Sequence, residues 1–172
     1  MAKIKVNQSM QKAVRAYNAG ETEAAKRLFA RIIAIEPNQP DANHNMGSLL
    51  VKSGDVENAV PFFKTALEAN FGVIQYWFSY IEALFKLGRY TESSELLAIA
   101  KTKGCKGQAF DDLETKLSST EVKLRSRIEK LQKSDLDGPY AYVAHFEIGK
   151  AWQKLGKLEE AIAAYTKALS LK

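Results

Sequence analysis

The side chains that most often carry chemistry are few in this sequence and lie far apart. His44 and His145 are about a hundred positions apart, and Cys105 is the only cysteine. A zinc site needs several His, Cys or carboxylate ligands close together, and this spacing does not offer them. The sequence also has no phosphate loop, dinucleotide motif or G-x-S-x-G nucleophile motif. We therefore expect no catalytic residues, no metal site and no cofactor, and so a chain that is not an enzyme.

Charged residues form two patterns that deserve a chemical interpretation. Adjacent carboxylates stand at positions 111–112 and 159–160, on what the sequence predicts to be polar helix faces, so we interpret them as solvated surface. A basic run contains one acidic residue, Glu129, and comprises Lys123, Arg125, Arg127, Lys130 and Lys133. Such a stripe is an alternative site for nucleic acid, an acidic partner or anionic lipid. No aromatic residue interleaves with it, so we favour a solvated helix face over nucleic-acid binding.

Composition and charge exclude several classes of protein. Of 172 residues, 46% are hydrophobic and 26% are charged, with a formal net charge of +5, which is ordinary for a globular protein. A single cysteine cannot form a disulfide within the chain. No stretch approaches 18 consecutive apolar residues, and the N-terminal segment lacks the apolar core of a secretory signal. We expect a cytoplasmic protein without membrane insertion.

The elements that would position any site are helices. Apolar residues recur at steps of three and four, which is typical of amphipathic helices. This pattern predicts helices over 4–19, 21–35, 41–52, 56–69 and 90–101, another between Gly72 and Gly88, and a clear pair over 142–172. Between residues 108 and 131 we predict two short helices with a cap or a break at Ser118–Glu121. The segment 134–139 (SDLDGP) carries a strong loop signal.

The helices repeat with a fixed period. Turn glycines at Gly20, Gly54 and Gly88 are 34 residues apart, and Gly156 lies 68 further on, twice that period. The vacant position falls at Val122, in the less regular stretch. Nine residues after each glycine stands a large side chain, and seven before it stands, in most copies, a small one. The large side chains are Phe29, Phe63, Leu97 and Tyr165. The small residues are Ala13, Gly47 and Gly149, with Ile81 as the exception.

A period of 34 with these small and aromatic columns resembles the tetratricopeptide repeat (TPR) family. The resemblance implies an all-α, right-handed α-solenoid of stacked antiparallel helix pairs, with about five units in a single array. The units would span 6–39, 40–73, 74–107, a degenerate 108–141, and 142–172. The family's unit-ending proline is present as Pro37, whereas Phe71 and Cys105 occupy the next two such positions.

The resemblance also implies a function. In this family the first helix of each unit lines a concave groove that binds an extended or helical peptide. The positions carried over here are Tyr17, His44, Asn45, Ser48, Lys52, Phe78, Ser79, Glu82, Phe85 and Lys86. Phe78 and Phe85 are seven apart and share one helix face, so they are either binding anchors or packing residues. A carboxylate clamp is not expected, because Asn7 and Gln75 stand where basic residues would be needed.

Three hypotheses follow about the molecule as a whole. The first is a non-catalytic protein–protein interaction scaffold. The second is the N-terminal region of a larger glycosyl-, methyl- or sulfotransferase, since arrays resembling this one often precede such domains in bacteria. The third is nucleic-acid binding through residues 123–133. Self-association through the pair at 142–172 is a further expectation, since its last helix has an apolar side with no following unit to cover it.

Overall fold

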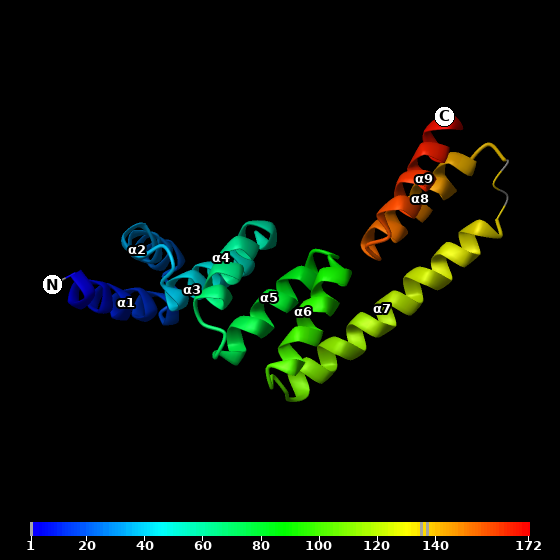
Figure 1. Ribbon diagram of the computed structural model, residues 1–172. Coiled ribbons are helices and arrows are strands. Elements are labelled where there is room, and N and C mark those ends of the chain that lie inside the picture. The colour runs from blue at the N-terminus through cyan, green and yellow to red at the C-terminus, as the bar shows by residue number, and fades with distance from the viewer. Residues whose placement is uncertain (1, 135, 137) are drawn as a thin grey trace. The chain divides into compact units, whose positions relative to one another are not determined.

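The structure is a computed structural model that describes residues 2–134, 136 and 138–172. Within this part, all regular secondary structure is α-helical (Figure 1). The chain divides into two compact units, residues 1–87 and 88–172, which are described separately. The all-α repeat fold predicted from the sequence is confirmed. That the units form one continuous array stays a prediction.

The first unit consists of two helix hairpins and a fifth helix. Its helices are α1 (Ala2–Asn18), α2 (Thr22–Ile35), α3 (Pro40–Lys52), α4 (Val56–Ala69) and α5 (Ile74–Lys86). Each packs against the next along the chain. The connection between the hairpins is held by the buried Asn43, whose Nδ2 donates 2.8 Å hydrogen bonds to the carbonyls of Pro37 and Gln39. The side chain of Gln39 in turn caps α3 by accepting from the backbone N–H of Ala42.

The hairpin turns depend on glycine. Gly20, Gly54, Gly88 and Gly156 have φ between 68° and 84°, a left-handed conformation that residues with a Cβ rarely adopt. At Gly54 the backbone N–H donates to the carbonyl of Val51, and the N–H of Asp55 reaches back to Leu50. These bonds satisfy carbonyls that the end of α3 would otherwise leave without partners. The first helix of each of these hairpins therefore ends in the same way, at the predicted 34-residue period.

The two helices of a hairpin meet where a small residue faces a ring. A Cβ added at Gly47 in α3 would lie only 2.7 Å from the ring of Phe63 in α4. In the last hairpin a Cβ at Gly149 would lie 2.6 Å from the ring of Tyr165. The helices approach closely at these points because no side chain separates them. The sequence columns of small and large residues thus mark the contact that joins each pair.

The described residues of the second unit form four helices. These are α6 (Tyr90–Thr102), α7 (Gln108–Gln132), α8 (Ala141–Lys154) and α9 (Leu158–Ser170). The helix α7 packs on α6 and α8, and α8 packs on α9. Ile128 from α7 and Ile148 and Ala151 from α8 form a buried cluster, with Trp152 packed against it. This cluster ties the long helix to the last hairpin.

The predicted break at Ser118–Glu121 is wrong. The helix α7 is continuous over 25 residues, and Val122, the expected turn position, is an exposed residue within it. Hydroxyl groups that suggested a cap instead bond back to the helix: the Oγ of Ser119 donates to the carbonyl of Lys116 at 3.0 Å. Helices tolerate such bonds, and no Gly or Pro stands between 108 and 132 to interrupt the backbone.

The connection between α7 and α8 agrees with the predicted loop at 134–139. The helix α7 ends at Gln132 and α8 begins at Ala141. Positions 135 and 137 of that loop lie outside the described residues.

Candidate partner-binding surface

The candidate surface in the first unit is built by α1, α3 and α5, which are joined by contacts of one constant spacing. The Nζ of Lys52 lies 4.0 Å above the centre of the Tyr17 ring. His44 Nε2 and Ser79 Oγ are 2.9 Å apart and share a hydrogen bond. Each pair is separated by 35 residues, which is one repeat plus one position. Each side chain of one first helix therefore lies beside the residue that follows its equivalent in the next first helix.

A third contact of the same spacing was missed from the sequence. The hydroxyl of Tyr76 donates a short hydrogen bond to the carboxylate of Asp41. Burial first, and then this bond, raise the pKa of the Tyr76 hydroxyl well above its usual value, so the phenol stays protonated. A comparison of polar residues 35 positions apart would have found this pair.

His44 is the centre of the surface. Its ring lies 5.0 Å from that of Tyr76 and 5.7 Å from that of Phe63, measured between centroids. Burial lowers the pKa of the imidazole below its usual value, and the carboxylate of Asp41 only partly offsets this. The imidazole is therefore neutral at pH 7 and packs as an aromatic side chain.

The polar residues of the surface differ in how free they are to bind a partner. The Oγ of Ser48 donates to the carbonyl of His44 at 3.0 Å, so part of its hydrogen-bonding capacity is used within α3. Lys86 and Glu82 form an exposed ion pair at 3.1 Å. An exposed pair of this kind adds little stability and can exchange its partner at small cost.

The remaining predicted residues are half-buried. Asn45 lies on α3, and Phe78 and Phe85 lie on α5. Their intermediate exposure fits both the binding and the packing interpretation of the two phenylalanines. The amide of Gln75, which occupies a position where a clamp would need a base, donates to Ser79 Oγ at 3.2 Å.

The basic run of the second unit lies along the exposed side of α7. Arg125 is paired with Glu121 at 2.9 Å, and Arg127 with Glu147 at 2.7 Å. Lys150 shares the same carboxylate at 2.9 Å, and its hydrogen bond, aided by Arg127, lowers the pKa of Glu147. Two of the five basic residues are thus neutralised by acidic neighbours, which weakens the stripe as an anion-binding surface.

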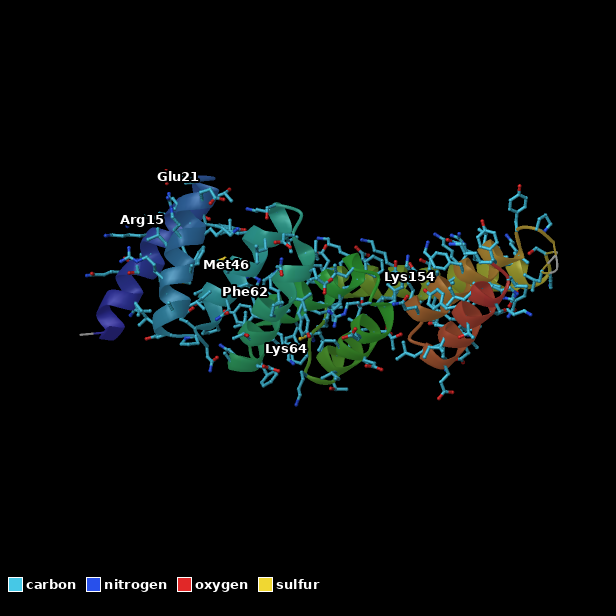
Figure 2. The ribbon with its side chains drawn as sticks, turned by 90° about the horizontal axis from the view of Figure 1, so that it is seen from above. Arg15, Glu21, Met46, Phe62, Lys64 and Lys154 are labelled. Carbon is cyan, nitrogen blue, oxygen red and sulfur yellow. The ribbon has the colours of Figure 1, made fainter. Side chains whose placement is uncertain are left out.

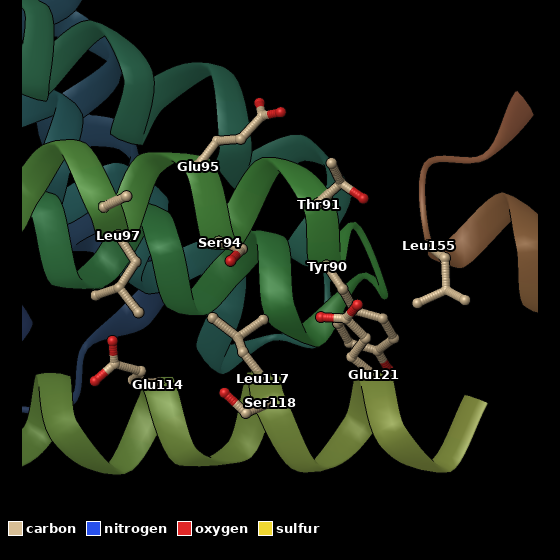
Figure 3. A pocket seen from close by; sticks show the side chains of 11 residues that line it. Tyr90, Thr91, Ser94, Glu95, Leu97, Glu114, Leu117, Ser118, Glu121 and Leu155 are labelled. Atoms are coloured by element: carbon tan, nitrogen blue, oxygen red, sulfur yellow. The ribbon is translucent and has the colours of Figure 1, made fainter. Parts of the chain in front are cut away.

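A cavity of about 350 Å³ lies between α6 and α7 in the second unit (Figure 3). Its wall carries the carboxylates of Glu95, Glu114 and Glu121, together with apolar Leu117 and Leu155. Glu114 is held by Lys101 at 2.5 Å, and Glu121 is the partner of Arg125. Among the described residues no cluster of three metal-binding side chains occurs. Ion pairs within the chain therefore use two of the cavity's three carboxylates.

Comparisons with known proteins agree with this architecture. One tetratricopeptide repeat model matches residues 16–77 and another matches residues 142–172. A crystal structure of MamA has a TM-score of 0.62 at 19% identity, covering 99% of this chain and 93% of that one. MamA 41-end from Desulfovibrio magneticus RS-1 also has a TM-score of 0.62, at 23% identity, covering 97% of this chain and 94% of that one.

A third structural relative is YrrB, described as a TPR protein with an unusual peptide-binding site. It has a TM-score of 0.60 at 16% identity, covering 95% of this chain and 84% of that chain. Comparison of the sequence with curated proteins finds no match. At these identities the structural likeness shows the fold.

The described helices form hairpins whose two helices meet where a glycine or small residue packs against a ring. Repeated hairpins of this kind define a helical-repeat scaffold of the kind that serves protein–protein interactions. The chain belongs to the tetratricopeptide repeat family. None of its described helices is both long and apolar enough to cross a membrane.

Proposed function

We propose that this chain is a non-catalytic scaffold that binds a segment of a partner protein on the surface formed by α1, α3 and α5. The observation that carries the proposal is the series of contacts spaced by 35 residues. They align the first helices of successive hairpins, so side chains that are scattered in sequence form one surface. Pairing of Lys52 with Tyr17 and of His44 with Ser79 also fixes these side chains before a partner arrives, which reduces the entropy lost on binding.

The chemistry of the surface favours a peptide with mixed character. It offers aromatic rings from Tyr17, Phe78 and Phe85 beside an amide, hydroxyls and two exposed lysines. Aromatic anchors within a polar surround are typical of interaction hot spots. The peptide-binding site described for YrrB, a relative of the same fold, supports the same kind of ligand.

The test screens a peptide library against the purified, immobilised chain. We expect saturable binders whose affinity falls when Lys52→Glu reverses a charge on the surface. Lys64→Glu is the matched control, because Lys64 is an exposed lysine on α4 that pairs with Glu68 at 3.8 Å (Figure 2). The absence of any saturable binder, or equal losses with both variants, would count against the proposal.

The two phenylalanines refine the location. Replacing Phe78 and Phe85 together by alanine should abolish binding while changing the melting temperature little, if both rings face the partner. A large fall in the melting temperature instead assigns them to packing, and the binding surface then rests on α1 and α3.

A further inference from the structure

The second unit carries an apolar groove that the proposed peptide surface does not include. It lies between α8 and α9 and has a volume of about 570 Å³. Its walls are mostly aromatic and aliphatic: Tyr142, Val143, Phe146, Gln153, Tyr165, Ala168, Leu169 and Lys172. Single exposed apolar residues need no explanation, but a groove lined by them does.

In the first unit the residues equivalent to this groove are covered by a helix. Phe63, Ala66 and Leu67 on α4 lie 102 positions, three repeats, before Tyr165, Ala168 and Leu169 on α9. In the first unit α5 packs against α3 and α4. Tyr76 and Ser79 of α5 make the contacts with Asp41 and His44 described above.

The exposed fractions of equivalent residues show the effect of the helix that covers them. Leu67 is 3% exposed beneath α5, whereas its equivalent Leu169 is 76% exposed. Phe146, which stands at the position of His44, is 49% exposed. The position of the repeat held by Leu67 and Leu169 is thus buried in the α3–α4 pair and exposed in the α8–α9 pair. In the first unit a helix, α5, packs against the equivalent pair.

The lining indicates which groups a helix bound in this groove should present. Asp41 and His44, which bind the hydroxyls of α5, are replaced by Val143 and Phe146 at the equivalent positions. A helix in this groove must therefore offer apolar groups where α5 offers Tyr76 and Ser79, three residues apart. One turn further along, α5 presents the buried Ala83, so the spacing is i, i+3, i+7, as in helix-in-groove recognition.

Charge at the groove selects the sign of the ligand. Of the described residues that line it, Lys172 is charged and none is acidic. Lys150 lies nearby, with its Nζ 5.6 Å from the centre of the Phe146 ring, but it is paired with Glu147 at 2.9 Å. A helix with carboxylates beside its apolar face would complement Lys172.

A second copy of this chain fits the groove poorly. Two such grooves placed face to face are both concave and would bring their lysines together. In end-to-end stacking, α1 would take the place of α5, with Gln8, Gln11 and Arg15 at the positions of Tyr76, Ser79 and Ala83. These side chains are exposed and polar, and Arg15 is labelled in Figure 2. They would set amides and a positive charge against an apolar, basic groove.

We propose that the groove between α8 and α9 binds an amphipathic helix of a partner protein, apolar at i, i+3 and i+7 and acidic beside that face. This site is separate from the α1–α3–α5 surface. A partner that engages both surfaces at once would gain avidity without any new contact.

The test uses a fluorescently labelled synthetic peptide, as long as α5, with leucines at the stated spacing and glutamates elsewhere. The full-length chain should bind it saturably. Leu169→Ser should weaken binding by about tenfold or more, as expected for a central apolar contact. The matched control is Ile162→Ser, because Ile162 is also on α9 and exposed, at 64%, but lies outside the groove. Neither variant should change the melting temperature.

Results of three kinds would overturn the proposal. One is no saturable binding, or equal binding by the Leu169→Ser and Ile162→Ser variants. A second is equal affinity for a peptide with lysines in place of the glutamates, or no effect of Lys172→Gln. A third is a concentration-dependent dimer that Leu169→Ser abolishes, which would make a second copy the occupant. Lys52→Glu should leave binding of this helical peptide unchanged. Failure of the groove proposal can therefore be distinguished from failure of the proposed peptide surface.

Discussion

The helix pairs α3–α4 and α8–α9 share one construction and differ in what lies against them. Both place a glycine under a ring, Gly47 under Phe63 and Gly149 under Tyr165. In the first pair the ring is buried beneath α5, and in the second it is half-exposed at an open groove. The contact inside a pair is therefore set by its own residues, whereas its burial depends on the helix that follows.

The largest difference should come from removing the rings. Phe63→Ala deletes a fully buried ring, and such changes lower the free energy of unfolding by about 3–5 kcal/mol. Tyr165→Ala should cost only about 1–2 kcal/mol, because water already reaches the groove beside it. Urea unfolding followed by circular dichroism measures both. Equal costs would show that the two rings are equally buried in solution.

Filling the close contact should have the next largest effect. Gly47→Leu forces a side chain against the Phe63 ring, which α4 and α5 prevent from moving, at a cost of about 2–3 kcal/mol. In Gly149→Leu the ring of Tyr165 can turn into the open groove, so we expect a loss smaller by about 1 kcal/mol. The same unfolding experiment decides. A larger loss at Gly149 than at Gly47 would contradict this account of the groove.

Removing one hydroxyl tests the contact by which α5 covers the first pair. Tyr76→Phe leaves the Asp41 carboxylate without its hydrogen bond and should cost about 1 kcal/mol or slightly more. The comparison is Tyr165→Phe, whose hydroxyl donates to the exposed Gln153 at 2.9 Å. That change should fall within about 0.5 kcal/mol of zero. A cost for Tyr165→Phe equal to that for Tyr76→Phe would argue against a special role of the Asp41 contact.

The smallest effect is a dependence on pH that one pair has and the other lacks. The folded pKa of His44 is below its usual value of 6.5, so the unfolded chain binds the proton more readily. The stability contributed by the neutral imidazole is complete above that value and falls as the pH drops through it towards the folded pKa. Phe146, at the equivalent position of α8, does not titrate.

His44→Gln should therefore flatten the pH dependence of the melting temperature between neutral pH and pH 5, while Phe146→Gln should not. Carboxylates with lowered pKa, such as Glu147, act in a separate window below pH 4.5. An unchanged slope in the His44→Gln variant would mean that the imidazole is not desolvated in solution.

Most of the hairpin architecture follows from local signals in the sequence. Glycine at a left-handed turn and the three-and-four spacing of apolar residues gave α4 its observed bounds of Val56–Ala69. The error at Ser118–Glu121 arose because Ser and Thr serve equally as caps and as mid-helix residues that bond to the preceding turn. The apolar positions Leu117 and Leu124 are seven apart, two helical turns, and so already favoured continuity.

The candidate surface was harder to predict, for a physical reason. The sequence places His44 and Ser79 at equivalent faces of successive helices, but only packing decides which neighbour each side chain meets. The bond between Tyr76 and Asp41 joins an aromatic residue in the first turn of α5 with an acid in the first turn of α3. The open groove was foreseen in part, because the apolar spacing of residues 158–169 predicts an apolar side on α9. Its filled counterpart beneath α5 became evident from the exposures of Leu67 and Leu169.

The most direct test of the comparison between the two pairs is chemical access to those two leucines. Cysteine is introduced as Leu67→Cys or Leu169→Cys after Cys105→Ala has removed the native thiol, which is buried. Reaction with a thiol reagent is timed for the folded chain and again in urea. We predict that the thiol at 169 reacts at nearly its unfolded rate, while that at 67 is slower by at least about an order of magnitude, because α5 must first open. Equal rates at the two positions in the folded chain would contradict the account.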